Sequence, residues 1–173
     1  MRGNVPVSAM EPVDASGITA LTPYAGHDLA VGLEYIRRKD LASARRVLDS
    51  VRSRIAIMKG AKSSDSAANR YTSVTQNDVD TVSVMEMILD AAIDFASGNG
   101  DNGIRKAVAA AETEDKLVFE YGPPIIVKPA WEVAAEMMLH AGRKTDAADA
   151  FRHVLKRFPN RRLANDGLRA ATK

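Results

Sequence analysis

The 173-residue sequence contains no cysteine. This absence excludes disulfide bonds, thiolate nucleophiles and zinc sites built on cysteine, and it leaves the cellular compartment undecided. Aromatic residues make up only 5% of the chain. Because strands favour aromatic and β-branched residues, the alanine-rich composition favours closely packed helices. The length suffices for one domain with a real core and is short for two.

A large net charge and a long apolar run are missing as well. The formal net charge is +2, so no global field would draw the chain to nucleic acid or to a membrane surface. No stretch approaches the roughly 20 apolar residues of a membrane-spanning helix. Residues 1–17 lack the apolar centre of a signal peptide. These features favour a cytoplasmic location, although a chain trimmed of its leader would look the same.

Apolar residues recur with the 3.6-residue period of amphipathic helices along most of the chain. Residues 1–24 lack this period, which predicts an extended or disordered arm in front of a single helical domain, 25–173. Glycine, proline and short polar stretches divide the domain into seven expected helices, over about 26–38, 41–58, 78–97, 102–117, 129–141, 144–158 and 161–172. The sequence therefore predicts an all-α fold, with three antiparallel helix pairs and a C-terminal capping helix.

Local signals add detail to this division. Asp40, Thr75 and Asp101 stand where N-caps are expected, because their side chains can accept hydrogen bonds from the first free backbone N–H groups of a helix. Gly60 is expected to end the second helix. The polar segment 62–77 is the longest internal linker, and we expect it to be mobile.

The stretch 128–161 carries the spacing of a known 34-residue helical repeat. Counted from its first residue, Trp131 falls at position 4, Ala147 at position 20, Phe151 at position 24 and Pro159 at position 32. These are the signature positions of a tetratricopeptide repeat. The hairpin therefore resembles one repeat of that family.

The first hairpin fits the same frame, and the middle one fits poorly. With Ala25 at position 1, Gly32 falls at position 8, Tyr35 at 11 and Ala44 at 20, whereas Gly103 stands at position 20 of the middle pair. The chain thus resembles a divergent three-hairpin tetratricopeptide module. A narrower resemblance is to the C-terminal helical region of uncharacterised bacterial proteins of this family. The resemblance implies a right-handed superhelical scaffold for protein interaction and implies no reaction.

In this family the first helix of each pair lines the concave surface. The corresponding positions here are apolar, which is typical of a groove for a partner helix or an extended peptide. A tightly closed core would give the same pattern and is the commoner reason for it. The residues expected at the partner-binding surface are Leu29, Leu33, Ile36, Arg37, Met85, Ile88, Glu132, Glu136 and His140. The carboxylate clamp that some family members use needs Lys and Asn where Leu29 and Leu33 stand, which argues against that class of partner.

Three of these residues, Glu132, Glu136 and His140, are four apart and form one stripe along a helix. The stripe could be a polar recognition surface or part of a metal site. The commoner alternative is a solvated face whose carboxylates pair with Arg or Lys on neighbouring elements. A third ligand group is not visible, so we expect neither a metal nor a cofactor.

Charge alternates along the chain. Residues 37–62 are basic, 78–115 acidic and 152–162 basic again. This pattern could bind an acidic partner or a phosphate backbone, but it more often means that neighbouring hairpins attract each other. Nucleic acid is disfavoured because aromatic residues for base stacking are not interleaved with the basic ones.

Catalysis finds little support in the sequence. None of the three histidines, His27, His140 and His153, has a nucleophile or a metal ligand at a motif spacing. The leading hypothesis is a non-catalytic protein–protein interaction module with a protein or peptide partner. A structural accessory or C-terminal docking domain of a larger assembly and, less favoured, an enzyme of unrecognised type stay open, as does a homo-oligomer.

Overall fold

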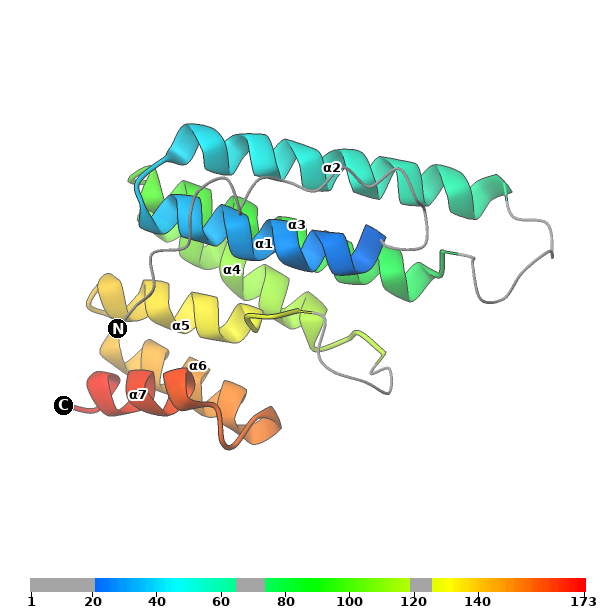
Figure 1. The fold of residues 1–173 in the computed structure, drawn as a ribbon. Coiled ribbons are helices and arrows are strands. Elements are labelled where there is room, and N and C mark those ends of the chain that lie inside the picture. Colours follow the sequence, from blue (N-terminus) through cyan, green and yellow to red (C-terminus); the bar gives the residue numbers. More distant parts are fainter. Residues whose placement is uncertain (1–20, 65–73, 119–125) are drawn as a thin grey trace.

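The computed structural model describes residues 21–64, 74–118 and 126–173. Over these ranges the regular structure is entirely helical, and no strand occurs in them (Figure 1). The helices are α1 (Leu21–Arg37), α2 (Leu41–Ser64), α3 (Gln76–Ala96), α4 (Gly100–Glu114), α5 (Ala130–His140), α6 (Lys144–Arg157) and α7 (Arg162–Ala171). The all-α expectation and the seven helices are therefore confirmed for the described part of the chain.

Two helix boundaries differ from the expected ones. Helix α1 begins at Leu21, inside the expected arm, because Leu21 is buried and the Thr22 hydroxyl bonds Asp78 of α3 over 3.3 Å. Helix α2 continues to Ser64 through Gly60, which costs a helix interior only about 1 kcal/mol. The remainder of the expected arm, and most of the expected mobile linker, lie outside the described residues.

The predicted helix caps hold at two places and fail at one. Thr75 and Asp78 form a capping box at α3, with bonds of 3.1 Å and 2.9 Å. Asp40 accepts a 3.0 Å bond from the backbone N–H of Ser43 at the start of α2. Helix α4, in contrast, begins before Asp101, and the residue at its N-cap position is Asn99.

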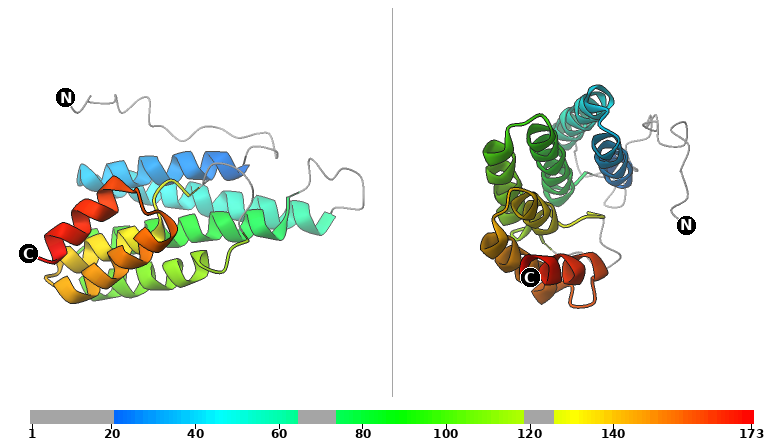
Figure 2. Two further views of the ribbon diagram at one scale, coloured as in Figure 1. Left: turned by 90° about the horizontal axis from the view of Figure 1, so that it is seen from below. Right: turned by 90° about the vertical axis from the view of Figure 1, so that its left-hand side faces the viewer.

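The helices pack in chain order as hairpins. Helix α1 pairs with α2, α3 with α4 and α5 with α6, while α7 covers α6 and touches α5. The first helices also contact one another, α1 against α3 and α3 against α5. Seen end-on, the helices follow an arc with α1, α3 and α5 on its inner side (Figure 2). The three inner helices run in the same direction, so their C-terminal ends lie at the same side of the molecule (Figure 1).

Small residues let these helices approach closely. The position where a Cβ of Gly32 would lie is 2.6 Å from the side chain of Leu89, so α1 rests directly on α3. Gly103 of α4 faces the backbone of α3 in the same way, at 2.8 Å from the backbone nitrogen of Phe95. A larger residue at Gly32 would push α1 away from α3, and one at Gly103 would push α4 away from α3. The middle pair thus departs from the repeat frame at Gly103 because its helices need that contact.

Opposite charges link the first two hairpins, as the charge alternation predicted. Arg52 of α2 pairs with Glu86 and Asp90 of α3 at 2.7 Å and 3.3 Å. Lys106 of α4 pairs with Asp90 at 2.6 Å and also with Asp94. Such part-exposed pairs contribute about 0.2–1 kcal/mol each, so they align the helices while the apolar core supplies the stability. No helix within the described ranges is long and apolar enough to cross a membrane.

Candidate functional site: a groove between α1 and α5

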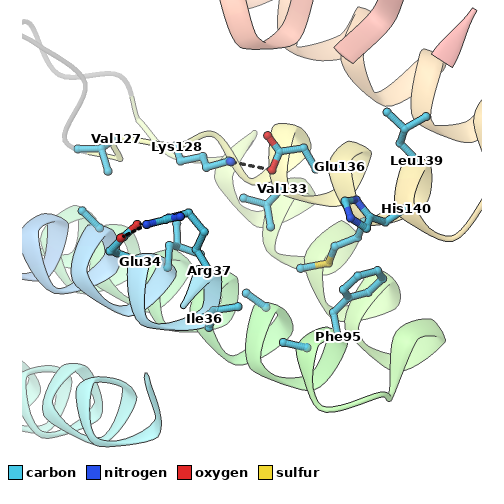
Figure 3. A pocket seen from close by; sticks show the side chains of 15 residues that line it. Glu34, Ile36, Arg37, Phe95, Val127, Lys128, Val133, Glu136, Leu139 and His140 are labelled. Carbon is cyan, nitrogen blue, oxygen red and sulfur yellow. Dashed lines mark hydrogen bonds and ion pairs between the residues drawn. The ribbon is translucent and has the colours of Figure 1, made fainter. Parts of the chain in front are cut away.

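A groove of about 810 Å³ lies between the C-terminal halves of α1 and α5 (Figure 3). Helix α3 packs between these two helices and contributes its last turns to the groove. The segment just before α5 closes one end. The lining residues are Ala30, Leu33, Glu34, Ile36, Arg37, Ala92, Phe95, Ala96, Val127, Lys128, Val133, Glu136, Met137, Leu139 and His140.

Most of the lining is apolar, and part of it is open to solvent. Leu33 and Ile36 of α1, Phe95 of α3 and Leu139 of α5 are all half-buried, packed against the core on one side only. Val127 is 51% exposed. Apolar side chains that keep solvent-exposed surface in one concave place mark ligand or partner sites.

The charges at the rim are paired within each wall. On the α1 wall the Glu34 carboxylate accepts bonds from Arg37 at 2.6 Å and from Arg38 at 2.7 Å. These bonds, first that from Arg37 and then that from Arg38, lower the pKa of Glu34 from 4.5 to about 2. On the α5 wall Lys128 pairs with Glu136 at 2.7 Å (Figure 3). The groove therefore has an apolar interior and walls whose carboxylates are already paired with cations.

The structure brings together five of the nine residues expected at a partner-binding surface, and the other four do not line the groove. Leu33, Ile36 and Arg37 come from α1, and Glu136 and His140 from α5. The expectation fails for Leu29, Met85 and Ile88, which are fully buried in the core. They are covered because α3 is the central helix of the stack, packed by α1 on one side and by α5 on the other.

Glu132 is the fourth residue outside the groove. It is fully buried, and Arg161 donates two hydrogen bonds to its carboxylate, of 2.5 Å and 2.9 Å. This bond raises the pKa of the Arg161 guanidinium. Glu136 is also paired, so the alternative of carboxylates bonded to neighbouring cations describes both residues. The expected stripe is broken, and only its Glu136 and His140 reach the groove.

Sequence reasoning missed the contribution of the last turn of α3. Phe95 and Ala96 lie on the helix that carries Met85 and Ile88, about three turns further along. The apolar period marked the whole helix as inward-facing and could not show where its neighbours stop covering it. Met137 and Leu139 of α5 also line the groove and were not among the residues expected there.

Polar chemistry for a reaction is scarce around the groove. Within the described residues there is no group of three or more His, Asp or Glu side chains placed to hold a metal ion. His140 is the only histidine in the groove lining, and the only nearby carboxylate on its helix, Glu136, is bonded to Lys128. The lining is mainly an apolar contact surface, and most of its ionisable groups are bonded to one another.

A second polar feature, outside the groove lining, joins α1 to α2. Asp28 is fully buried, and Arg54 donates to its Oδ2 atom at 2.9 Å. The Arg54 guanidinium also lies 5.8 Å from the ring centre of Tyr24. His27 Nδ1 is 3.8 Å from Asp28 Oδ1. A buried Arg–Asp bond of this kind fixes how two helices pair, and we assign it a structural role.

The chain matches no protein-family model, no curated protein and no solved structure. The geometry and chemistry of the groove therefore carry the functional conclusion.

Proposed function

We propose that the protein is a non-catalytic interaction module that holds one short segment of a partner protein in the groove between α1 and α5. The observation that carries the proposal is the open apolar surface that Leu33, Phe95 and Leu139 form from three different helices. A groove built by three helices can bind a helix or an extended peptide that inserts a few apolar side chains into it.

The proposal includes a tetratricopeptide-like superhelix. Support comes from hairpins that pack in chain order and from first helices that lie side by side on the inner side of the arc. In such a stack each hairpin buries one side against its neighbours and leaves a continuous concave surface. The groove occupies that surface.

The chemistry of the walls defines the partner segment. Because Glu34 and Glu136 are already bonded to cations of their own wall, a strongly acidic or basic peptide would gain little by contacting them. The segment that fits presents uncharged apolar side chains to the groove, spaced by about one turn if it is helical. A docking domain with no captured segment is the alternative, and the openness of the groove favours capture over it.

A peptide selection tests this function. Peptides that bind the intact protein are selected from a random library, and the dissociation constant of one of them is then measured with variants. Val127→Glu introduces a charge into the groove, and Ile57→Glu introduces the same charge on α2, away from it. The two side chains are equally exposed, at 51%, so the two substitutions place the same charge at sites of equal burial.

We expect Val127→Glu to weaken binding by about tenfold or more, because burying an unpaired charge costs over 1.4 kcal/mol. Ile57→Glu should bind as the unmodified protein does. Equal affinity of all three proteins for every selected peptide would place the binding surface elsewhere and refute the proposal.

A further inference from the structure

Two Asn-Gly dipeptides lie within one turn of each other where α3 passes into α4. The first, Asn99–Gly100, forms the N-cap and first residue of α4. Asn99 is exposed, and its side chain makes no capping hydrogen bond. The second, Asn102–Gly103, lies inside α4. The same dipeptide thus stands in two different environments only three residues apart.

In the second dipeptide, both the side-chain amide of Asn102 and the backbone nitrogen of Gly103 are held by hydrogen bonds. Asn102 donates to Asp94 at 2.5 Å and accepts a bond from Arg105. The backbone N–H of Gly103 donates to the carbonyl of Asn99 over 2.9 Å. Gly103 is also buried against α3, with the place of a Cβ only 2.9 Å from the carbonyl oxygen of Ala91. Neither its amide nitrogen nor the Asn102 side chain can move without breaking these contacts.

We propose that Asn99 is a site of spontaneous covalent modification. The sequence alone allows the same reaction at both dipeptides, and the fold favours it at the first. The backbone nitrogen of Gly100 attacks the side-chain amide carbon of Asn99. A new C–N bond forms, the bond to the side-chain nitrogen breaks, and ammonia leaves with the proton that Gly100 gives up. Water then opens the resulting five-membered succinimide to aspartate or isoaspartate. No oxidant, cofactor or second protein takes part.

Glycine makes the attack at Gly100 easy because it has no side chain beside the attacking nitrogen. The exposed position of Asn99 also lets water reach the succinimide. At Asn102 the same reaction requires that the first turn of α4 open, because its side chain and the Gly103 N–H are both bonded. Opening costs at least one hydrogen bond, and this difference separates the rates of the two sites.

The products change the start of α4 in different ways. Aspartate places a carboxylate at the N-terminus of a helix, where the helix dipole favours it. Isoaspartate routes the backbone through the former side chain, which adds one methylene, and turns the Asn99 carbonyl that accepts the Gly103 N–H bond into a free carboxylate outside the main chain. The place of a Cβ on Gly100 is 3.9 Å from the ring of Phe95, a groove residue, so a displaced backbone at Gly100 should also weaken peptide binding. That last consequence alone rests on the proposed function.

The test follows both sites by mass spectrometry during incubation in warm buffer at neutral pH. In the folded protein we expect Asn99 to react about tenfold faster than Asn102, or more, since one hydrogen bond must open at the slower site. In urea, where the fold is lost, both sites should react at similar rates. Equal rates in the folded protein, or a faster reaction at Asn102, would overturn the proposal.

A variant separates this chemistry from any change in folding. Gly100→Ala hinders the attacking nitrogen, and the added Cβ meets nothing closer than the Phe95 ring at 3.9 Å, which is ordinary contact. The variant should fold and lose most of the reaction at Asn99. An unchanged rate in this variant would also overturn the proposal. Because the readout is mass, failure of the peptide-binding function would leave this result intact.

Discussion

The carboxylate of Glu114, at the end of α4, accepts a 2.6 Å hydrogen bond from the backbone N–H of Ala130, the first residue of α5. The N-cap residue of α5 is Pro129, whose side chain cannot accept a hydrogen bond, so Glu114 supplies the missing cap from the preceding hairpin. One buried side chain therefore couples the end of the second hairpin to the start of the third. Helix α5 forms a wall of the groove, so this contact helps to position the candidate site.

Removal of this cap should destabilise the protein. We expect Glu114→Ala to lower the free energy of unfolding by about 1–3 kcal/mol, because a buried N–H would lose its only acceptor. Urea denaturation measures the change. Glu112→Ala is the matched control, since Glu112 is an exposed residue on the same helix and should change stability by less than about 0.5 kcal/mol. Equal losses in both variants would mean that the bond to Ala130 contributes nothing.

The same residue predicts a dependence of stability on pH. Burial raises the pKa of Glu114 above its ordinary value of 4.5, and the bond from Ala130 only partly offsets this. The folded state binds the proton of Glu114 more tightly than the unfolded state does. The resulting contribution to the free energy of unfolding is fully present below the unfolded pKa and is lost as pH rises through the folded pKa. The advantage of the unmodified protein over Glu114→Gln, which does not titrate, should therefore shrink as pH rises from 4.5. Unfolding curves across that range check it, and an advantage that grows would contradict it.

The buried pair of Asp28 and Arg54 gives a third prediction. Arg54→Leu should cost about 3–5 kcal/mol, because it leaves the fully buried Asp28 carboxylate without its cation. Replacing both residues by leucine should recover most of that loss. Arg52→Leu, which removes part-exposed pairs with Glu86 and Asp90, should cost no more than about 2 kcal/mol. A double variant as unstable as Arg54→Leu alone would show that the loss comes from packing rather than from the unpaired charge.

Two glycines in helices should respond oppositely to substitution by alanine. At Gly103 the new Cβ would lie 2.7 Å from the Cβ of Phe95 and 2.8 Å from its backbone nitrogen. These atoms cannot yield without moving α3, so Gly103→Ala should lower the free energy of unfolding by about 1–3 kcal/mol. At Gly60, in α2, a Cβ meets nothing within 4 Å, and alanine should raise stability by about 0.5–1 kcal/mol. Thermal unfolding of both variants decides the matter, and two changes of the same sign would contradict the packing argument.

The apolar period and the turn residues were enough to predict the helices, because both act locally along the chain. The start of α1 was missed, since Leu21 is drawn into the helix by burial against residues distant in sequence. Gly60 was given too much weight as a helix end for a related reason: a single glycine costs less than continued helix formation gains. The N-cap of α4 was expected two residues too late, at Asp101, because the helix begins at Gly100 with Asn99 as its N-cap.

The candidate site was predictable only in part. Leu33 and Ile36 were identified from their apolar period, and they line the groove because the described helices cover the end of α1 only in part. The period that marked them marks Leu29 and Met85 equally, and only the positions of neighbouring helices decide which apolar face is open. The pairing of Glu132 with Arg161 spans 29 positions and has no local signal. Burial and pairing depend on how the helices pack against one another. The sequence pattern could therefore indicate which helix faces are apolar, but not which of their residues line the groove.

The bond between Glu132 and Arg161 ties the last turn of the chain to α5, and it should be required for stability but not for peptide binding. Arg161 comes from the turn between α6 and α7, and it also donates to the carbonyl of Val127 over 3.4 Å. Arg161→Ala would leave the fully buried Glu132 carboxylate uncompensated, at a cost of about 3–5 kcal/mol. Arg162→Ala, an exposed neighbour, should change stability by less than about 0.5 kcal/mol.

Measuring stability and peptide affinity on the same samples separates the structural role of Glu132 from the proposed binding role of His140. At temperatures where Arg161→Ala is still folded, its affinity for a selected peptide should stay close to that of the unmodified protein, because neither Glu132 nor Arg161 lines the groove and the only groove residue that loses a bond is Val127, at the long distance of 3.4 Å. His140→Ala removes an exposed groove residue and should show the reverse, with stability kept and affinity reduced. If His140→Ala left affinity unchanged while Arg161→Ala reduced it in the folded state, the binding surface would lie at the buried pair and not in the groove between α1 and α5.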